Sequence, residues 1–188
     1  YFDVDKAAEE HRGYIEALER NGVEVYTVHE LLSQVPMDKL RSCAMSALTY
    51  DNSALTDTAV VENDAYRLSI IDQMSRADLI RCILLRPTVK LQSTASNTGL
   101  EAMYTHAPLM NLYFTRDQSI STPRGHIISQ MNSSQRALET EIIALCYEQL
   151  GVKPILTITG KGRLEGGDYL RGDDISYIGC GMRTNMEA

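Results

Sequence analysis

The sequence predicts an α/β fold in which strand–strand–helix–strand units are interrupted by one long helical segment. Glycine divides the chain of 188 residues: none occurs in residues 23–98, whereas nine of the twelve lie in residues 125–181. A glycine-free stretch favours helices, and a glycine-rich stretch favours turns between strands. The order helix, glycine, strand also occurs twice, around Gly22 and around Gly151. An internal repeat of this kind predicts a repeat architecture.

Composition restricts the class of protein. Hydrophobic residues make up 44% and charged residues 23%, and the formal net charge is −7, which together indicate a globular chain rather than a disordered one. The negative charge argues against nucleic acid or an acidic membrane as partner. A polar, acidic beginning and the lack of a long apolar run predict a cytoplasmic location. The cysteines are far apart and indicate reduced thiols rather than a zinc site: Cys43, Cys82, Cys146 and Cys180.

The first segment predicts a helix followed by a strand. Apolar residues recur at helical spacing over residues 7–18, and Asn21-Gly22 is typical of a helix end. Residues 23–28 alternate apolar and polar side chains, which predicts a strand.

Residues 33–105 are expected to be helical throughout and to form an insert between two parts of the α/β unit, residues 1–32 and 106–188. Pro36 fits a first helical turn, and Ser75 with Asp78 fits an N-cap. The helical pattern is weakest over residues 90–104.

The remaining chain predicts the repeat unit itself. Strands are expected over residues 112–119 and 126–131, with a turn at 123–125 between them. A helix then runs from Asn132 or Ser133 to Leu150, and a strand follows over residues 152–158.

A third unit is expected to begin near residue 168 with strands on either side of the turn at residues 171–174. Thr184 and Glu187 have the spacing of a capping box, which predicts the start of a helix. The first unit lacks its hairpin and the third its helix, so we expect a fragment of a longer repeat protein.

Three clusters could carry chemistry. Residues 111–117 and 164–168 each place carboxylates beside a strand, and two arginines, Arg136 and Arg183, lie near expected helix starts. Taken singly, these clusters also fit an exposed strand end, an acidic turn and a surface ion pair of Arg136 with Glu139. Taken together, they describe a pocket that is acidic at one end and basic at the other, which suits an amino acid with a cationic tail.

These clusters resemble the arginine deiminase family of guanidino-group-modifying, amidinotransferase-like enzymes. Four segments carry the resemblance in the family's order: N-x-x-F-T-R-D at residues 111–117, R-x-x-E at 136–139, L-E-G-G-D at 164–168 and G-x-R-T at 181–184. The family fold is a five-bladed α/β propeller (pentein) of ββαβ units. The glycine-free segment matches the position of the family's inserted α-helical bundle.

The resemblance implies a role for each matched residue. Asp117 and Glu165 would hold the guanidinium group of L-arginine, and Arg136 and Arg183 would bind its α-carboxylate. Asn111 and Phe114 would line the pocket. The family's reaction, part of arginine catabolism, uses a cysteine nucleophile and a histidine acid/base, forms a thiouronium intermediate and yields L-citrulline and ammonia, without metal or organic cofactor.

The resemblance stops before the family's H-x-D motif and its late cysteine. We therefore expect the substrate-binding half of the site, and no activity from this chain alone. The alternatives are another amidino-hydrolase or amidinotransferase of the superfamily, or a non-catalytic binding half-protein. A homo-oligomer, or association with the missing half, is expected because incomplete propeller units expose sheet edges.

Overall fold

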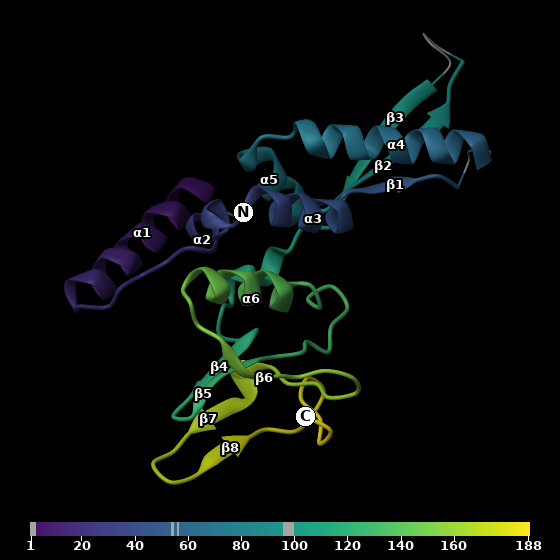
Figure 1. Ribbon diagram of the computed structural model, residues 1–188. Helices are drawn as coiled ribbons and strands as arrows, with labels where there is room; N and C mark the ends of the chain where they lie inside the picture. The colour runs from purple at the N-terminus through teal and green to yellow at the C-terminus, as the bar shows by residue number, and fades with distance from the viewer. Residues whose placement is uncertain (1–2, 54, 56, 96–99) are drawn as a thin grey trace.

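The computed structural model describes residues 3–53, 55, 57–95 and 100–188. It is a mixed α/β structure with three small sheets (Figure 1). The helical segment with its own sheet lies at one end of the molecule. The other two sheets lie at the opposite end, and α6 (Glu139–Gln149) lies between (Figure 1).

Helix α1 (Val4–Arg20) is present and ends at Asn21-Gly22 as the sequence predicts. Asp3 caps it by accepting a hydrogen bond from the backbone N–H of Lys6 at 3.0 Å, and Gly22 follows its end with φ +77°. The strand expected at residues 23–28 is wrong. Thr27 instead forms a capping box with Glu30, and this box starts helix α2 (Val28–Gln34).

Residues 33–105 are not helical throughout. The expected helices are present as α3 (Met37–Ala47), α4 (Asp57–Gln73) and α5 (Arg76–Leu85). A three-stranded sheet accompanies them, in the order β1 (Thr49–Asp51), β2 (Pro87–Ser93) and β3 (Leu100–His106). Strands β2 and β3 pair antiparallel, with Val89 opposite Tyr104, over the stretch where the helical pattern is weakest.

One complete strand–strand–helix–strand unit is present. Strands β4 (Ser119–Thr122) and β5 (Gly125–Ile128) form an antiparallel hairpin, and β6 (Pro154–Thr157) lies parallel to β5 after α6. The strand expected at residues 112–119 is wrong: its first two residues end a 3₁₀ turn (Met110–Tyr113), residues 115–117 form a further turn, and β4 begins only at Ser119. Helix α6 begins at Glu139, later than expected, because residues 132–138 form bends and turns.

The third unit is represented by the hairpin of β7 (Tyr169–Arg171) and β8 (Ser176–Ile178). No helix follows Thr184 within the described residues, which end in turns. The capping-box interpretation is wrong, because the Thr184 hydroxyl donates its hydrogen bond to Asp168 at 2.6 Å and accepts one from the Glu165 backbone at 3.1 Å.

The main hydrophobic core joins the helical segment to the repeat unit. It is formed by buried side chains of α2, α3, α5 and α6, among them Leu32, Leu40, Ile83 and Ile142. A second small core is formed by Ile120, Ile158 and Leu164, and the partly buried Ile127 and Tyr169 pack against it. Strands β6, β7 and β8 leave large apolar side chains exposed, and α1 buries no residue. Much apolar surface of β6, β7 and β8 is therefore open to water.

Candidate functional site

Asp117 reaches the site on a turn rather than on a strand. The backbone N–H of Phe114 donates to Asn111 O, and that of Asp117 donates to Phe114 O, each at 3.0 Å. These two bonds fold residues 111–117 into consecutive turns directly before β4. The Asp117 side chain is 17% exposed and points to a guanidinium group.

That guanidinium belongs to Arg136, which lies three residues before α6. Its Nη1 is 2.9 Å from Asp117 Oδ2 and 3.7 Å from Glu165 Oε2. Its Nε donates to Glu139 Oε2 at 2.9 Å. Burial opposes the charge on Arg136, but hydrogen bonds to Asp117 and Glu139 outweigh that cost and raise the pKa of the guanidinium. Arg136 therefore stays charged although it is buried.

Glu165 is buried and is tied to the Asp117 turn through its neighbour. The backbone N–H of Gly166 donates to Asp117 O at 2.9 Å. A Cβ at Gly166 would lie 2.0 Å from Arg116 O, so only glycine allows the two segments to lie this close. The E-G-G-D glycines thereby bring the two carboxylates to one place.

Arg183 completes the cluster from the C-terminal turn. Its Nη1 lies 3.3 Å from Glu165 Oε2, and its side chain remains 64% exposed. Thr184, which is 1% exposed, holds this turn against Glu165 and Asp168 through its hydroxyl. Arg183 is thus at the solvent side of the cluster, whereas Arg136 is at its buried side.

The structure brings four of the six sequence-predicted site residues together: Asp117, Glu165, Arg136 and Arg183. They form direct ion pairs rather than the expected pocket with an acidic and a basic end. The structure brings Asn111 close through its backbone, whose oxygen accepts from Arg136 Nη2 at 3.4 Å. Phe114 is 53% exposed and packs edge-on against Tyr113 with ring centroids 5.4 Å apart.

Sequence reasoning missed one member of the cluster, Gln118. Its side chain is fully buried and donates to Glu139 Oε2 at 2.6 Å and to Asn111 O at 3.3 Å. Glu139 therefore has two buried donors, Gln118 and Arg136. The only signal in the sequence was its place directly after the T-R-D segment.

The cluster has an acidic excess and holds one guanidinium firmly. Three carboxylates, from Asp117, Glu139 and Glu165, face two arginines, Arg136 and Arg183. Carboxylates match the planar donor fork of a guanidinium. No set of three or more potential metal ligands occurs among the described residues. The acidic excess of the cluster suits it to binding a guanidinium group.

The sequence was compared with known proteins. The sequence model of the arginine deiminase family matches residues 1–188. The chain belongs to the arginine deiminase family. Arginine deiminase of Borrelia garinii subsp. bavariensis is 25% identical over 98% of this chain, which covers 47% of that protein. Arginine deiminase of Bacillus cereus (strain ATCC 10987) is 28% identical over 95% of the chain and 46% of its own length. The chain thus spans about half the length of these relatives.

Two solved structures are also similar over a shorter part. A dimethylarginine dimethylaminohydrolase adduct with 4-chloro-2-hydroxymethylpyridine shares 32% identity over 41% of this chain and 31% of its own, with a TM-score of 0.37. A mutant of the Pseudomonas aeruginosa dimethylarginine dimethylaminohydrolase complexed with citrulline shares 33% identity over 41% of this chain and 30% of its own, also with a TM-score of 0.37.

The family match covers all four segments on which the resemblance was based. It therefore confirms the assignment to the arginine deiminase family, whereas the role of each site residue stays a prediction. No helix in the described part of the chain is long and apolar enough to cross a membrane.

Proposed function

We propose that this chain supplies the substrate-binding half of an arginine deiminase, which hydrolyses L-arginine to L-citrulline and ammonia. The observation that supports it most is that Asp117 and Glu165, distant in sequence, face the same guanidinium nitrogen, Nη1 of Arg136. A pair of carboxylates that holds the guanidinium of a side chain is chemically able to hold that of a free arginine. Family membership supports the same assignment.

In this proposal, Arg136 makes room for the substrate. Its Nε contact to the buried Glu139 anchors the side chain, while its Nη1 turns from Asp117 toward the substrate α-carboxylate. Asp117 and Glu165 then receive the substrate guanidinium. Arg183, at the solvent side, would bind the α-carboxylate together with Arg136, and Asn111 and Phe114 would lie beside the bound substrate.

The chemical step is assigned to residues outside this chain. A cysteine thiolate attacks the guanidinium carbon, a histidine donates the proton with which ammonia leaves, and water hydrolyses the thiouronium to citrulline and the free thiol. Three of the four cysteines are poor candidates for this role, because Cys82 and Cys146 are buried and Cys43 is partly buried. Burial raises the pKa of Cys146 to about 11 and also raises the pKa of Cys43 and Cys82. Only the thiolate is nucleophilic, so the raised pKa of these thiols disfavours them as nucleophiles near neutral pH.

The architecture proposed for the whole protein is the five-bladed propeller. The unit β4–β5–α6–β6 has the ββαβ order of one blade, and β7–β8 has the order of the next hairpin. Residues 33–105 would be the insert, and residues 1–32 and 106–188 the incomplete blades. The exposed apolar side chains of β6–β8 would be covered by further blades or by a second copy. A cytoplasmic location is part of the proposal, because the described free cysteines suit a reducing compartment.

Citrulline formation tests this proposal. The 188-residue chain should form no citrulline from L-arginine, whereas the chain extended to the full length of its relatives should. In the extended protein, Asp117→Asn or Glu165→Gln should lower kcat/KM by about 10- to 100-fold, the usual effect of losing a hydrogen bond to a charged group. The exposed carboxylate Asp72, whose side chain is 77% exposed, provides the control Asp72→Asn. Turnover by the 188-residue chain, or equal effects of the three substitutions, would contradict the proposal.

A further inference from the structure

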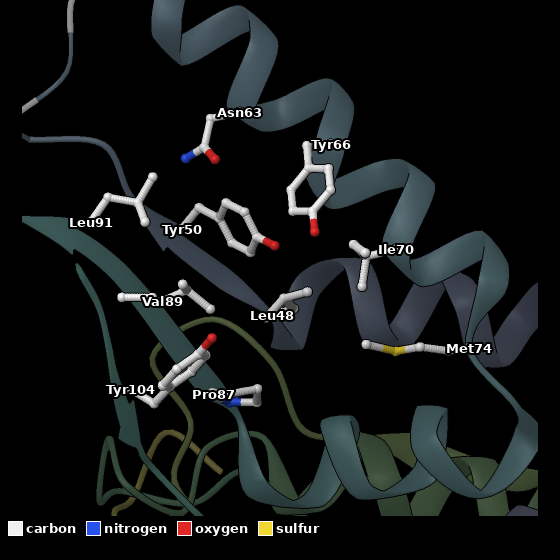
Figure 2. Close-up of a pocket in the computed structure, with 11 residues that line it drawn as sticks. Leu48, Tyr50, Asn63, Tyr66, Ile70, Met74, Pro87, Val89, Leu91 and Tyr104 are labelled. Carbon is white, nitrogen blue, oxygen red and sulfur yellow. The ribbon is translucent and has the colours of Figure 1, made fainter. Parts of the chain in front are cut away.

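A cavity of about 540 Å³ lies between α4 and one face of the β1–β2–β3 sheet. No residue of the carboxylate–arginine cluster lines it. The helix wall consists of Asn63, Tyr66 and Ile70, which are three or four residues apart and so form one stripe along α4, and of Met74 directly after the end of the helix. Figure 2 shows Asn63, Tyr66 and Ile70 projecting from α4 toward the sheet.

The sheet wall is formed by residues that the strand register places on one face. Tyr50, Val89 and Tyr104 occupy one row across the three strands. Leu91 and Ala102 form the next row, two residues along β2 and β3 and therefore on the same face. Two apolar walls thus face each other across an open space (Figure 2).

Specific hydrogen bonds hold the walls in place. Asn63 Nδ2 donates to Asn52 Oδ1 at 2.7 Å, next to the end of β1. Arg67 Nη1 donates to the backbone oxygens of Met45 and Leu48, each at 3.1 Å, between α4 and the end of α3. Helix α4 buries only Ile71 among its described residues. The space is a groove open to solvent, since Tyr66 on the helix wall is 58% exposed and Tyr104 on the sheet wall is 65% exposed. A groove of this volume with apolar walls has the size of a ligand site.

The lining determines which ligands suit the cavity. It contains no charged side chain, and its polar atoms are three tyrosine hydroxyls and the Asn63 amide. Burial raises the pKa of Tyr50, so this hydroxyl stays neutral at physiological pH. Tyrosines stand on both walls, Tyr66 on the helix and the other two on the sheet. Aromatic rings favour offset or edge-on contact with another ring.

We propose that this cavity binds a small, uncharged aromatic molecule, with its ring between the tyrosine-bearing walls and one polar group at a tyrosine hydroxyl or the Asn63 amide. The site lies in the insert and is independent of the proposed deiminase function. A charged ligand is disfavoured because its charge would meet no partner in the lining.

Indole is a suitable probe, since the chain has ten tyrosines and no tryptophan, and indole absorbs tyrosine emission. Titration calorimetry of the 188-residue chain with indole, with tyrosine emission as a second readout, should show saturable binding. A dissociation constant of about 1 mM or tighter is expected for a ligand of this size. Benzoate, which is aromatic but anionic, should bind at least about tenfold more weakly, the effect of one unpaired charge in an apolar site.

Two matched substitutions locate the binding. Ala102→Phe places a ring in the cavity and should weaken indole binding at least about tenfold, because the added side chain takes the ligand's volume. Ala65→Phe makes the same change on an exposed position of α4 outside the lining and should leave binding unchanged. If Ala102→Phe does not fold, Ala102→Leu decides, since its smaller side chain still occupies part of the ligand's volume and should weaken binding severalfold. The proposal is overturned if indole shows no saturable binding up to its solubility limit, if benzoate binds as well, or if the cavity variant matches its control.

Discussion

Replacing Arg136 by methionine tests the buried ion cluster on which the site depends. The Arg136 side chain is 10% exposed and lies against Asp117 and Glu139, whose side chains are 17% and 1% exposed. Its removal leaves carboxylates without their partner in a buried place, which costs about 3–5 kcal/mol of unfolding free energy. That is a large part of the 5–15 kcal/mol typical of a whole domain.

The matched control is Arg81→Met, which breaks an exposed ion pair. Arg81 lies 3.4 Å from Asp78, and the two side chains are 74% and 52% exposed. Such a pair contributes about 0–1 kcal/mol. Urea unfolding followed by circular dichroism measures both variants, and Arg136→Met should lower the midpoint by about 2 M if the slope is about 2 kcal/mol per M.

A second substitution separates lost charge pairing from lost packing. Adding Glu139→Met to Arg136→Met removes a buried carboxylate together with its partner, and should recover about 1 kcal/mol or more. The reasoning is refuted if Arg136→Met and Arg81→Met destabilise the chain equally, or if the double variant is less stable than Arg136→Met alone.

Three further outcomes are expected. Gly166→Ala should lower the melting temperature by several degrees, because its Cβ would meet backbone 2.0 Å away, whereas Gly13→Ala has no atom within 4 Å and should stabilise helix α1 slightly. Burial lowers the pKa of His126, so between pH 7.5 and 5.5 the unfolded state binds more protons than the folded state. The free energy of unfolding should therefore fall as the pH drops across that range. Thermal melts of His126→Phe at the same pH values should show a weaker pH dependence. Thr184→Val should speed hydrogen exchange of the Glu165 amide, and Thr184→Ser should not, because only serine keeps the hydroxyl.

Local sequence patterns predicted most of the helix ends and hairpins that are stabilised by residues close in sequence. The end of α1 at Gly22, the Ser75 cap of α5 and the hairpin around Gly125 all depend on a few neighbouring residues, and all are present. The strand expected at residues 23–28 failed, since a strand needs a partner and Thr27 has a local alternative in its capping box. The β2–β3 pair was missed because its pairing is between residues up to 19 apart, Pro87 with His106.

The sequence identified which residues form the site, but not how their side chains are arranged. The motifs named Asp117, Glu165, Arg136 and Arg183, and the structure brings them together. The spacing of Arg136 and Glu139 offered an ion pair between them, and that pair is present, although it is buried rather than on the surface. Nothing in the spacing indicated that Arg136 would also turn to Asp117 rather than stand across a pocket from it. That arrangement depends on the buried Glu139, whose burial follows from tertiary packing of α6.

Ligand binding to the 188-residue chain tests the central claim, that these carboxylates form a guanidinium site, most directly. Titration calorimetry should show that L-arginine binds saturably. L-citrulline, whose ureido group is uncharged, should bind at least about tenfold more weakly, since each charge-assisted hydrogen bond contributes about 1.5–3 kcal/mol. Glu165→Gln should weaken arginine binding by a similar factor and leave citrulline binding nearly unchanged. Equal affinity for the two ligands, or arginine binding that is insensitive to Glu165→Gln, would contradict the account.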